Sequence, residues 1–456
     1  MEQPTLTNIT EHLSAFLHNV RFDDLAPEAI AAAKNAVLDF VGVTLVGSRE
    51  DATRILREAC ASTGKRGVAT MLGTGMSTSL TTAALVNAYA AHALDYDDVH
   101  TVVGAHISAA TLAASLALAE SMHLTGKDLI AAYVAGFEIG CRLGKTNHVG
   151  HYLREHGVHP TGFLCHFAAV AAAGKLLNLD LTQTRRSLGI VGGHATGLMK
   201  SFGTMCKGQN AGNSAHNGLF AALLAQKGFT GPEDVFDGDG NVFAIYGAQT
   251  DAGELLAGLG HDYEITRNTF KVFACAGWRN PIIEATIALA DAHKLAAAEI
   301  QSVSVKVCKQ VAGLPNYARP ITGLQAKFSV QYAVAVALLD RAGYVAQFSD
   351  QRVADPILAA LCDRVTVEAG DGLELNQVRL AVRTVDGRDL AHFIAIPKGD
   401  PRNPLRWDEL MTKFRTNALT ALPARRVNKL ATTIRNLDTL TDVAELTRLC
   451  RPSKVS

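Results

Sequence analysis

The sequence lacks clustered cysteines, and this absence argues against two kinds of metal centre. Its eight cysteines are scattered over 456 residues and include no C-x-x-C pair. Zinc and iron–sulfur sites hold their metal through thiolates that lie close together. We therefore interpret the cysteines as small buried apolar residues in a reducing cytosol.

A basic excess and long apolar runs are also missing. Lys plus Arg and Asp plus Glu each total 43, so the formal net charge is zero. Binding to nucleic acid or to an anionic membrane would need a basic excess, so neither partner is expected. The most apolar stretches, such as residues 163–177, are interrupted by His or Lys and fall short of about 18 residues. The first ten residues, MEQPTLTNIT, do not resemble a signal peptide. These absences predict a cytoplasmic protein without a membrane span.

Apolar residues make up 48% of the chain, enough for a large core, and their spacing changes along it. The length favours two or three structural units. Helical spacing dominates the first 260 residues, whereas residues 301–309 and 377–396 alternate with a period of two, as strands do. After GDPRNP at 399–404 the spacing is helical again.

We therefore predict a mainly α protein of two domains. A large all-helical domain is built from both chain ends, residues 1–266 and 398–456, and a smaller α+β lid domain, residues 267–397, is inserted between them. The return of the C-terminal helices to the first domain is inferred from composition.

The stretch AAHALDYDDVH, residues 90–100, concentrates acidic and imidazole groups in an alanine-rich context. Three interpretations are open: a metal site, an acid–base site or a charged helix end. A calcium loop would need a glycine at its sixth position and an acidic residue at its twelfth, and neither is present. A helix end is the simplest interpretation of Asp97, Asp98 and His100.

Two histidines stand at expected helix starts. His106 lies at the start of a helical pattern, where a lone histidine is more often structural than catalytic. His159 precedes Pro160, which favours extended backbone just before a helix. Because the free N–H groups of a helix start favour anions, His159 could act as acid or base on a bound carboxylate.

Basic residues lie in two further segments. KSFGTMCKGQNAG brings Lys200 and Lys207 into a glycine-rich stretch that does not have the order of a phosphate-binding Walker loop. Lys271 and Arg279 lie at the junction of the two predicted domains, where pockets often form. The chain has no G-x-S-x-G nucleophile motif, and GTGMST is too incomplete to indicate dinucleotide binding.

Taken in order, these segments resemble the MmgE/PrpD family, which includes 2-methylcitrate dehydratase, cis-aconitate decarboxylase and iminodisuccinate epimerase. The resemblance implies a helical domain and an α+β lid, a homodimer, and a site between the domains that needs no cofactor. The matching stretches run from near residue 25 to about 420 and are AAHALDYDDVH, GVHPTGFLCHFAAVAAAGKLLNLD, SFGTMCKGQNAG, LLAQKGFTGPEDVFDG, the Lys271 segment, AKFSVQYAVAVALLD and GDPRNPLRWDELMTKF.

The resemblance also implies catalytic residues. It assigns Asp95, His106, the histidine of the His-Pro-Thr motif (His159), and two active-site lysines, Lys207 and Lys271. The chain departs from the family pattern in three places: Ile107 replaces a proline, Asn210 replaces a histidine, and Arg279-Asn280 replaces Thr-His. These changes suggest a substrate other than 2-methylcitrate, and the candidate substrate-binding residues are Arg279, Asn210, Gln209 and Lys200. A bidentate Arg279 could hold an additional carboxylate.

The predicted function is a cofactor-independent, metal-independent lyase acting on a di- or tricarboxylic acid. Lys207 and Lys271 would offset the charge that grows beside a carboxylate, His159 and His106 would move the proton, and Asp95 would orient a neighbouring group. Alternatives are an epimerase of a dicarboxylate such as iminodisuccinate, a non-catalytic carboxylate-binding protein, and a metal-dependent hydrolase at the aspartate cluster. Dehydration, decarboxylation and epimerisation share the first step, so the sequence leaves them open.

Overall fold

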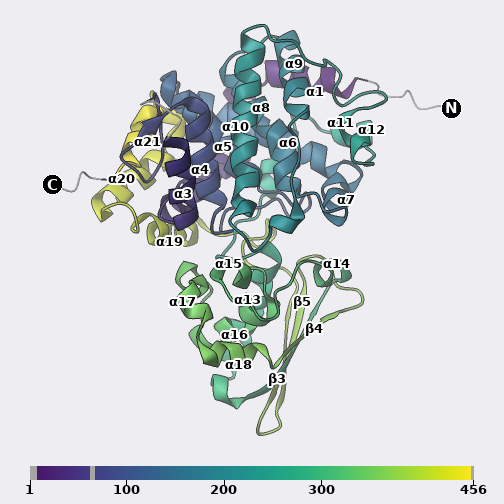
Figure 1. Ribbon diagram of the computed structural model, residues 1–456, viewed down its shortest axis with the longest axis vertical. Helices are drawn as coiled ribbons and strands as arrows, with labels where there is room; N and C mark the ends of the chain where they lie inside the picture. Colours follow the sequence, from purple (N-terminus) through teal and green to yellow (C-terminus); the bar gives the residue numbers. More distant parts are fainter. Residues whose placement is uncertain (1–7, 62–66, 453–456) are drawn as a thin grey trace.

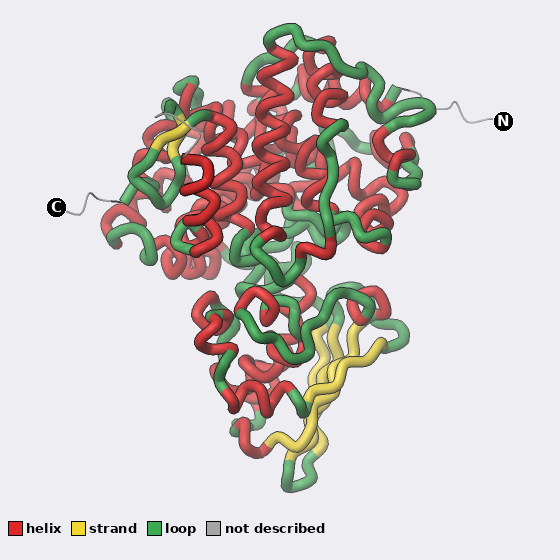
Figure 2. Tube along the Cα trace, in the orientation of Figure 1, coloured by secondary structure: helices red, strands yellow, loops and turns green. Residues whose placement is uncertain are grey.

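The computed structural model describes residues 8–61 and 67–452, and it is mainly helical. Figures 1 and 2 show a broad helical body and, below it, a smaller part that combines helices with a twisted sheet. The two parts meet where the chain passes from residue 267 onward and where it returns near residue 400. The mainly α class predicted from the sequence is confirmed.

The helical body contains both ends of the described chain. Its core is formed by alanine-rich helices that pack closely, α4, α5, α6, α8 and α10. The N-terminal elements are α1 (Ile9–Asn19), α2 (Pro27–Gly47), α3 (Asp51–Ala61), β1 (Ala69–Thr70), β2 (Ser77–Thr78), α4 (Leu80–His92), α5 (Ile107–Ser121), α6 (Gly126–Lys145), α7 (Val149–Glu155), α8 (Pro160–Leu176), α9 (Leu181–Gly192), α10 (Cys206–Gln226), α11 (Val242–Ile245) and α12 (Ala252–Leu256).

The C-terminal helices α19 (Trp407–Ala418), α20 (Ala424–Arg435) and α21 (Ala444–Leu449) return to this body. α19 packs along α2, and Phe414 of α19 is fully buried there. Lys413 also reaches α2, where its Nζ lies 2.6 Å from Asp39 Oδ1. A buried ion pair thus joins the two ends of the chain.

Among the described residues, one helix is long and apolar enough to cross a membrane by length and composition, and it is α2. In this structure 72% of its most apolar window is buried. It packs against α4, α5, α6 and α19, as the core helix of a globular protein does.

The α+β part is built on a four-stranded sheet with the order β4-β3-β5-β6. β3 pairs with β4 in parallel and with β5 antiparallel, and β5 and β6 form an antiparallel hairpin. Gly387 occupies the hairpin turn with a φ of 88°, a conformation that favours glycine. The strands are β3 (Ile300–Val307), β4 (Val365–Ala369), β5 (Val378–Thr384) and β6 (Asp389–Ile394). The period-two alternation thus predicted β3 and the β5–β6 hairpin correctly.

One face of the sheet is covered by helices. α13 packs on β5 and β6, and α16 packs on α13, α18 and β4. The helices of this part are α13 (Asn280–Ala292), α14 (Lys309–Ala312), α15 (Gly323–Ala326), α16 (Val330–Asp340), α17 (Asp350–Val353) and α18 (Pro356–Cys362). The chain breaks between α15 and α16, so the apolar stretch AKFSVQYAVAVALLD becomes helical in α16 only from Val330.

Candidate active site

The AAHALDYDDVH stretch leaves α4 at His92 and continues as a buried loop. Asp95 has a φ of 51°, in the left-handed region, so the chain turns sharply at this residue. Farther on, Val99 pairs with Thr269 in an isolated antiparallel bridge. This bridge ties the loop to the segment that leads into the α+β part.

The helix end expected for Asp97, Asp98 and His100 is wrong, because α4 has already ended and all three side chains are buried. Asp98 Oδ2 accepts a hydrogen bond from Ser108 Oγ at 2.5 Å. His100 Nε2 lies 3.2 Å from Glu264 Oε2. A buried polar group needs hydrogen-bond partners, and the fold supplies them from Ser108 and Glu264, outside the loop.

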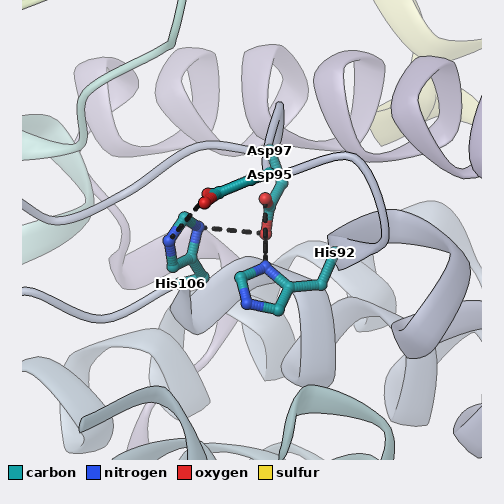
Figure 3. A group of neighbouring side chains, drawn as sticks. All are labelled: His92, Asp95, Asp97 and His106. Carbon is teal, nitrogen blue, oxygen red and sulfur yellow. Dashed lines mark hydrogen bonds and ion pairs between the residues drawn. The ribbon is translucent and has the colours of Figure 1, made fainter. Parts of the chain in front are cut away.

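Asp97 lies between two histidines, as Figure 3 shows. Its Oδ2 is 2.9 Å from His92 Nδ1 and 3.1 Å from His106 Nδ1. Burial opposes ionisation of Asp97, but His106 and His92 outweigh it and hold its pKa well below the usual range. Burial also lowers the pKa of His106 to about 3 and lowers that of His92. At neutral pH the rings are neutral, and the Nδ1–H of His92 stabilises the ionised carboxylate as a hydrogen-bond donor.

His92 connects this carboxylate to a lysine. Because its Nδ1 faces Asp97, its Nε2 is free to accept, and Lys207 Nζ lies 2.7 Å from it. Lys207 stands in the first turn of α10 and is buried, and burial lowers the pKa of its ammonium group. Asp97, His92 and Lys207 thus form a continuous hydrogen-bonded chain that fixes the direction of the lysine.

Asp95 is held by two lysines. Lys271 Nζ donates to Asp95 Oδ1 at 2.5 Å and to its backbone carbonyl at 2.8 Å, and Lys207 Nζ lies 3.4 Å from Oδ2. His106 Nε2 approaches Oδ1 at 3.6 Å. Burial would raise the pKa of Asp95, but Lys207 and Lys271 reverse this effect and keep it well below its usual range. Two ammonium groups thus share this carboxylate, and with the ionised Asp97 nearby the charges of the cluster balance.

His159 lies beside this cluster as the N-cap of α8, where the sequence predicted a helix start. Its ring stacks with that of His92 at 6.0 Å between centroids, and burial, followed by the charge of Lys207, holds its pKa well below 6.5. Asn210 Nδ2 lies 2.8 Å from His159 Nδ1 and also donates to Ser201 Oγ. Ser201 Oγ donates to Leu198 O, so the amide must donate to both partners. In the neutral imidazole the proton therefore lies on Nε2.

These groups line one cleft between the helical body and the α+β part. All five predicted catalytic residues border it, namely Asp95, His106, His159, Lys207 and Lys271. Phe202 and Phe328 also line it, with ring centroids 5.0 Å apart. The cleft combines apolar walls with a few converging polar groups, as small-molecule sites do.

The structure does not bring all predicted substrate-binding residues to this cleft. Arg279 is buried, but its guanidinium donates to the carbonyls of Pro315 and Phe328 and does not border the cleft. Lys200 is exposed on the surface, and Gln209 donates along α10. Asn210 acts through His159. The expected Arg279 clamp therefore has no support in this geometry.

Four residues that line or support the site were not assigned to it from the sequence: His92, Asp97, Arg154 and Trp278. His92 and Asp97 lie five residues apart in the AAHALDYDDVH motif, and their side chains are in hydrogen-bond contact. No local signal marks Arg154, which lies on α7 and borders the cleft.

His92, Asp95, Asp97 and His106 could also be considered as a metal site, since one ligand atom from each lies within 4.8 Å of the others. The ammonium groups of Lys207 and Lys271 already occupy Asp95, and a cation would have to compete with both. His92 Nε2 is directed at Lys207. The groups that could bind a metal ion, Asp95 and His92 among them, are therefore already paired with the lysines of the chain.

The fold and site together define a class of mainly helical protein with a buried carboxylate–lysine–histidine cluster between a helical body and an α+β part. The chain matches the MmgE/PrpD N-terminal domain over residues 11–254 and the MmgE/PrpD C-terminal domain over residues 273–439. It belongs to the MmgE/PrpD family, as the sequence motifs predicted.

Several curated proteins are similar over almost their whole length. Cis-aconitate decarboxylase of Aspergillus terreus is 27% identical over 97% of this chain and 96% of its own. Human cis-aconitate decarboxylase is 27% identical over 98% of this chain and 95% of its own. The cis-aconitate decarboxylase-like protein oryM of Aspergillus oryzae is 27% identical over 97% of both chains.

Proposed function

We propose that the protein is a lyase that acts on a di- or tricarboxylic acid without a cofactor, and that decarboxylation is its reaction. The observation that carries the proposal is the pair Lys207 and Lys271 around Asp95, buried in a cleft that His106 and His159 also line. The similarity to cis-aconitate decarboxylases makes cis-aconitate the first substrate to test.

The chemistry fits a decarboxylation assisted by cations. In an unsaturated tricarboxylate of this kind, the bond between the methylene carbon and its carboxylate breaks and CO2 leaves. The electron pair moves through the adjacent double bond and onto the carboxylate at its far end, and the carbon beside that carboxylate then takes a proton. Lys207 and Lys271 would stabilise the charge that grows on this carboxylate, because both ammonium groups are already held in place and shielded from water.

His159 is the residue we assign to the proton. Asn210 leaves the proton on Nε2 of the neutral ring, so Nε2 can donate. The pKa of His159 is held low by burial and by Lys207. A bound polyanion would offset the charge of Lys207 and raise this pKa, so that the histidine can take a proton from solvent and pass it to carbon. His106 would assist from the other side of Asp95.

The proposal includes the finer features that the family resemblance implies. The helical body comprises residues 1–266 and 398–456 and the lid residues 267–397, so that lid movement could open the cleft between them. The protein would work as a homodimer in the cytoplasm. The packing of α19 on α2 supports this division of the chain.

The experiment that tests the function is a mass-spectrometric screen of di- and tricarboxylates in deuterated water, beginning with cis-aconitate. Loss of CO2 with one deuterium gained on carbon supports the proposal. Gain or loss of water would replace it with a hydratase or dehydratase, and deuterium exchange without loss of mass would replace it with an epimerase. No change in any acid, together with a thermal shift, would show a carboxylate-binding protein instead.

Two substitutions test the assigned residues. His159→Ala and Lys271→Ala should each lower kcat at least about a hundredfold while the far-ultraviolet circular dichroism and the melting temperature stay near those of the wild type. His293→Ala and Lys309→Ala, at exposed positions, serve as matched controls and should leave kcat unchanged. Activity within a few-fold of the wild type in either site variant would refute the assignment.

A further inference from the structure

Arg154 is a buried cation at the cleft that the proposed chemistry does not use. It lies on α7, is 9% exposed and lines the same cleft as Lys207 and Lys271. Its guanidinium carbon lies 4.5 Å from the centre of the Trp278 ring, which also borders the cleft. The cation therefore rests on an aromatic face, an arrangement that holds a guanidinium in one orientation.

The polar contacts of Arg154 leave most of its hydrogen-bonding capacity unused. Nη2 donates to Gly104 O at 3.3 Å, and Nη1 lies 3.4 Å from His151 Nδ1. Within residues 8–61 and 67–452 it forms no ion pair with a carboxylate. By contrast, the buried Arg142 on α6 pairs with Glu138 and donates to three backbone carbonyls.

The backbone around Arg154 is shaped to hold the guanidinium. Gly104 has a φ of 69°, and a Cβ at this position would lie 1.4 Å from Arg154 Nη2. A side chain at residue 104 would therefore displace the guanidinium. The loop that follows the cluster at 90–100 makes room for the cation with a glycine.

The charges along the cleft have two centres. Lys207 and Lys271 share Asp95, and the ionised Asp97 nearby balances the charge of this cluster. Arg154 borders the same cleft with a positive charge that no carboxylate in residues 8–61 and 67–452 pairs with. The remaining lysine of the lining, Lys398, pairs with Glu409 at 2.9 Å. A ligand with two carboxylates could contact both the lysine pair and Arg154, whereas a monocarboxylate could contact only one of them.

We infer that Arg154, resting on Trp278, binds a second carboxylate of the substrate while Lys207 and Lys271 act on the first. This assignment rests on the proposed function and adds to it a residue that determines specificity. A planar guanidinium can hold a carboxylate through two parallel hydrogen bonds, so the site selects for the position of the second carboxylate as well as for its charge.

The test measures binding and needs no turnover. Calorimetric titration uses tricarballylate, a saturated tricarboxylate, and butyrate, a monocarboxylate, as probes. Arg154→Gln should weaken tricarballylate binding at least about tenfold and change butyrate binding less than twofold. Arg154→Lys keeps the charge but not the planar fork and should lie between Arg154→Gln and the wild type. Arg415→Gln, an exposed arginine on α19, is the matched control and should bind like the wild type.

Each outcome decides the inference. Tricarballylate binding by Arg154→Gln within twofold of the wild type would overturn it, and so would a wild type that binds tricarballylate no better than butyrate. If Arg154→Gln does not fold, Arg154→Lys decides, and unchanged affinity in that variant would overturn the inference. Failure of the proposed function would be seen separately. The wild type would then turn over none of the acids but would still bind tricarballylate in a way that depends on Arg154.

If cis-aconitate is turned over, Arg154→Gln should raise KM at least about tenfold with a smaller change in kcat.

Discussion

At the scale of residues, two neighbouring aspartates show how strongly the surroundings decide the chemistry. Asp97 is ionised because two histidines face it. In Asp98, burial and the charge of Asp39 raise the pKa to about 8, although Ser108 and Asn268 donate to its Oδ2. At neutral pH the first is a charged part of the site and the second is largely a neutral structural group.

Replacement of these two residues by asparagine should separate the roles. Asp97→Asn should lower kcat at least about tenfold, because it removes the charge that orients His92 and, through it, Lys207. Asp98→Asn should keep most of the activity, because asparagine is close in shape to a protonated aspartate. Equal losses of activity in the two variants would contradict this difference.

Asp98→Asn should also change the pH dependence of stability. The pKa of Asp98 is raised in the folded state from 3.8 to about 8. Its contribution to stability is therefore complete below about pH 4 and is lost as the pH rises toward 8, by at most roughly 1.4 kcal/mol per pH unit. Asparagine does not titrate, so the unfolding free energy of Asp98→Asn should gain on that of the wild type between pH 5 and pH 8 in urea titrations. A difference that does not vary with pH would contradict the raised pKa.

At the scale of elements, the site depends on where helices begin and end. His106 and His159 are the N-caps of α5 and α8, as the proline and the apolar spacing predicted. His92 is the last residue of α4. Because α4 carries His92 into the cluster, the packing of α4 against α2 sets the position of His92. The hydrogen bond to His92 in turn orients Lys207.

Gly47→Ala tests the contact between α2 and α4. A Cβ on Gly47 would lie 1.9 Å from the carbonyl oxygen of Ala90 in α4. Alanine would gain roughly 0.5–1 kcal/mol from helix propensity, but the overlap with backbone should cost more, so we expect a net loss of about 1–3 kcal/mol in the unfolding free energy. Gly75→Ala, where an added Cβ meets nothing within 4 Å, is the matched control. Urea unfolding measures both, and a Gly47→Ala variant as stable as the control would show that the helices can separate without cost.

At the scale of the whole molecule, the two ends of the chain meet beneath the active-site loop. Lys413 of α19 pairs with Asp39 of α2 and also donates to Tyr96 O at 2.7 Å, within the loop that carries Asp95 and Asp97. Burial of this pair has a cost, and each charge is tolerated because the other is present. The C-terminal helices therefore support the site as well as the core.

Lys413→Met should lower the unfolding free energy by about 3–5 kcal/mol, because Asp39 would be left as an uncompensated buried charge. The double variant Lys413→Met/Asp39→Leu should recover much of this loss. Lys306→Met, which breaks an exposed pair with Glu368 on the sheet, should change stability by less than about 1 kcal/mol. Urea unfolding of the four proteins measures these differences. A Lys413→Met variant as stable as Lys306→Met would contradict the role of the ion pair.

By itself, the sequence determined the mainly helical class, the positions of β3 and the β5–β6 hairpin, the helix starts at residues 106 and 159, and membership of the family. These features depend on short-range spacing, which repeats every two or 3.6 residues and can be seen without a structure. The motifs also indicated five residues that line the cleft.

Only the tertiary structure decided how the acidic cluster is used. Lys271 and Asp95 are 176 residues apart in sequence but in hydrogen-bond contact in space. The same folding buries Asp97 between two histidines, turns Arg279 away from the cleft and brings Arg154 to it. Burial and the charges of distant residues set the protonation of each of these groups, and neither can be seen in a local stretch of sequence.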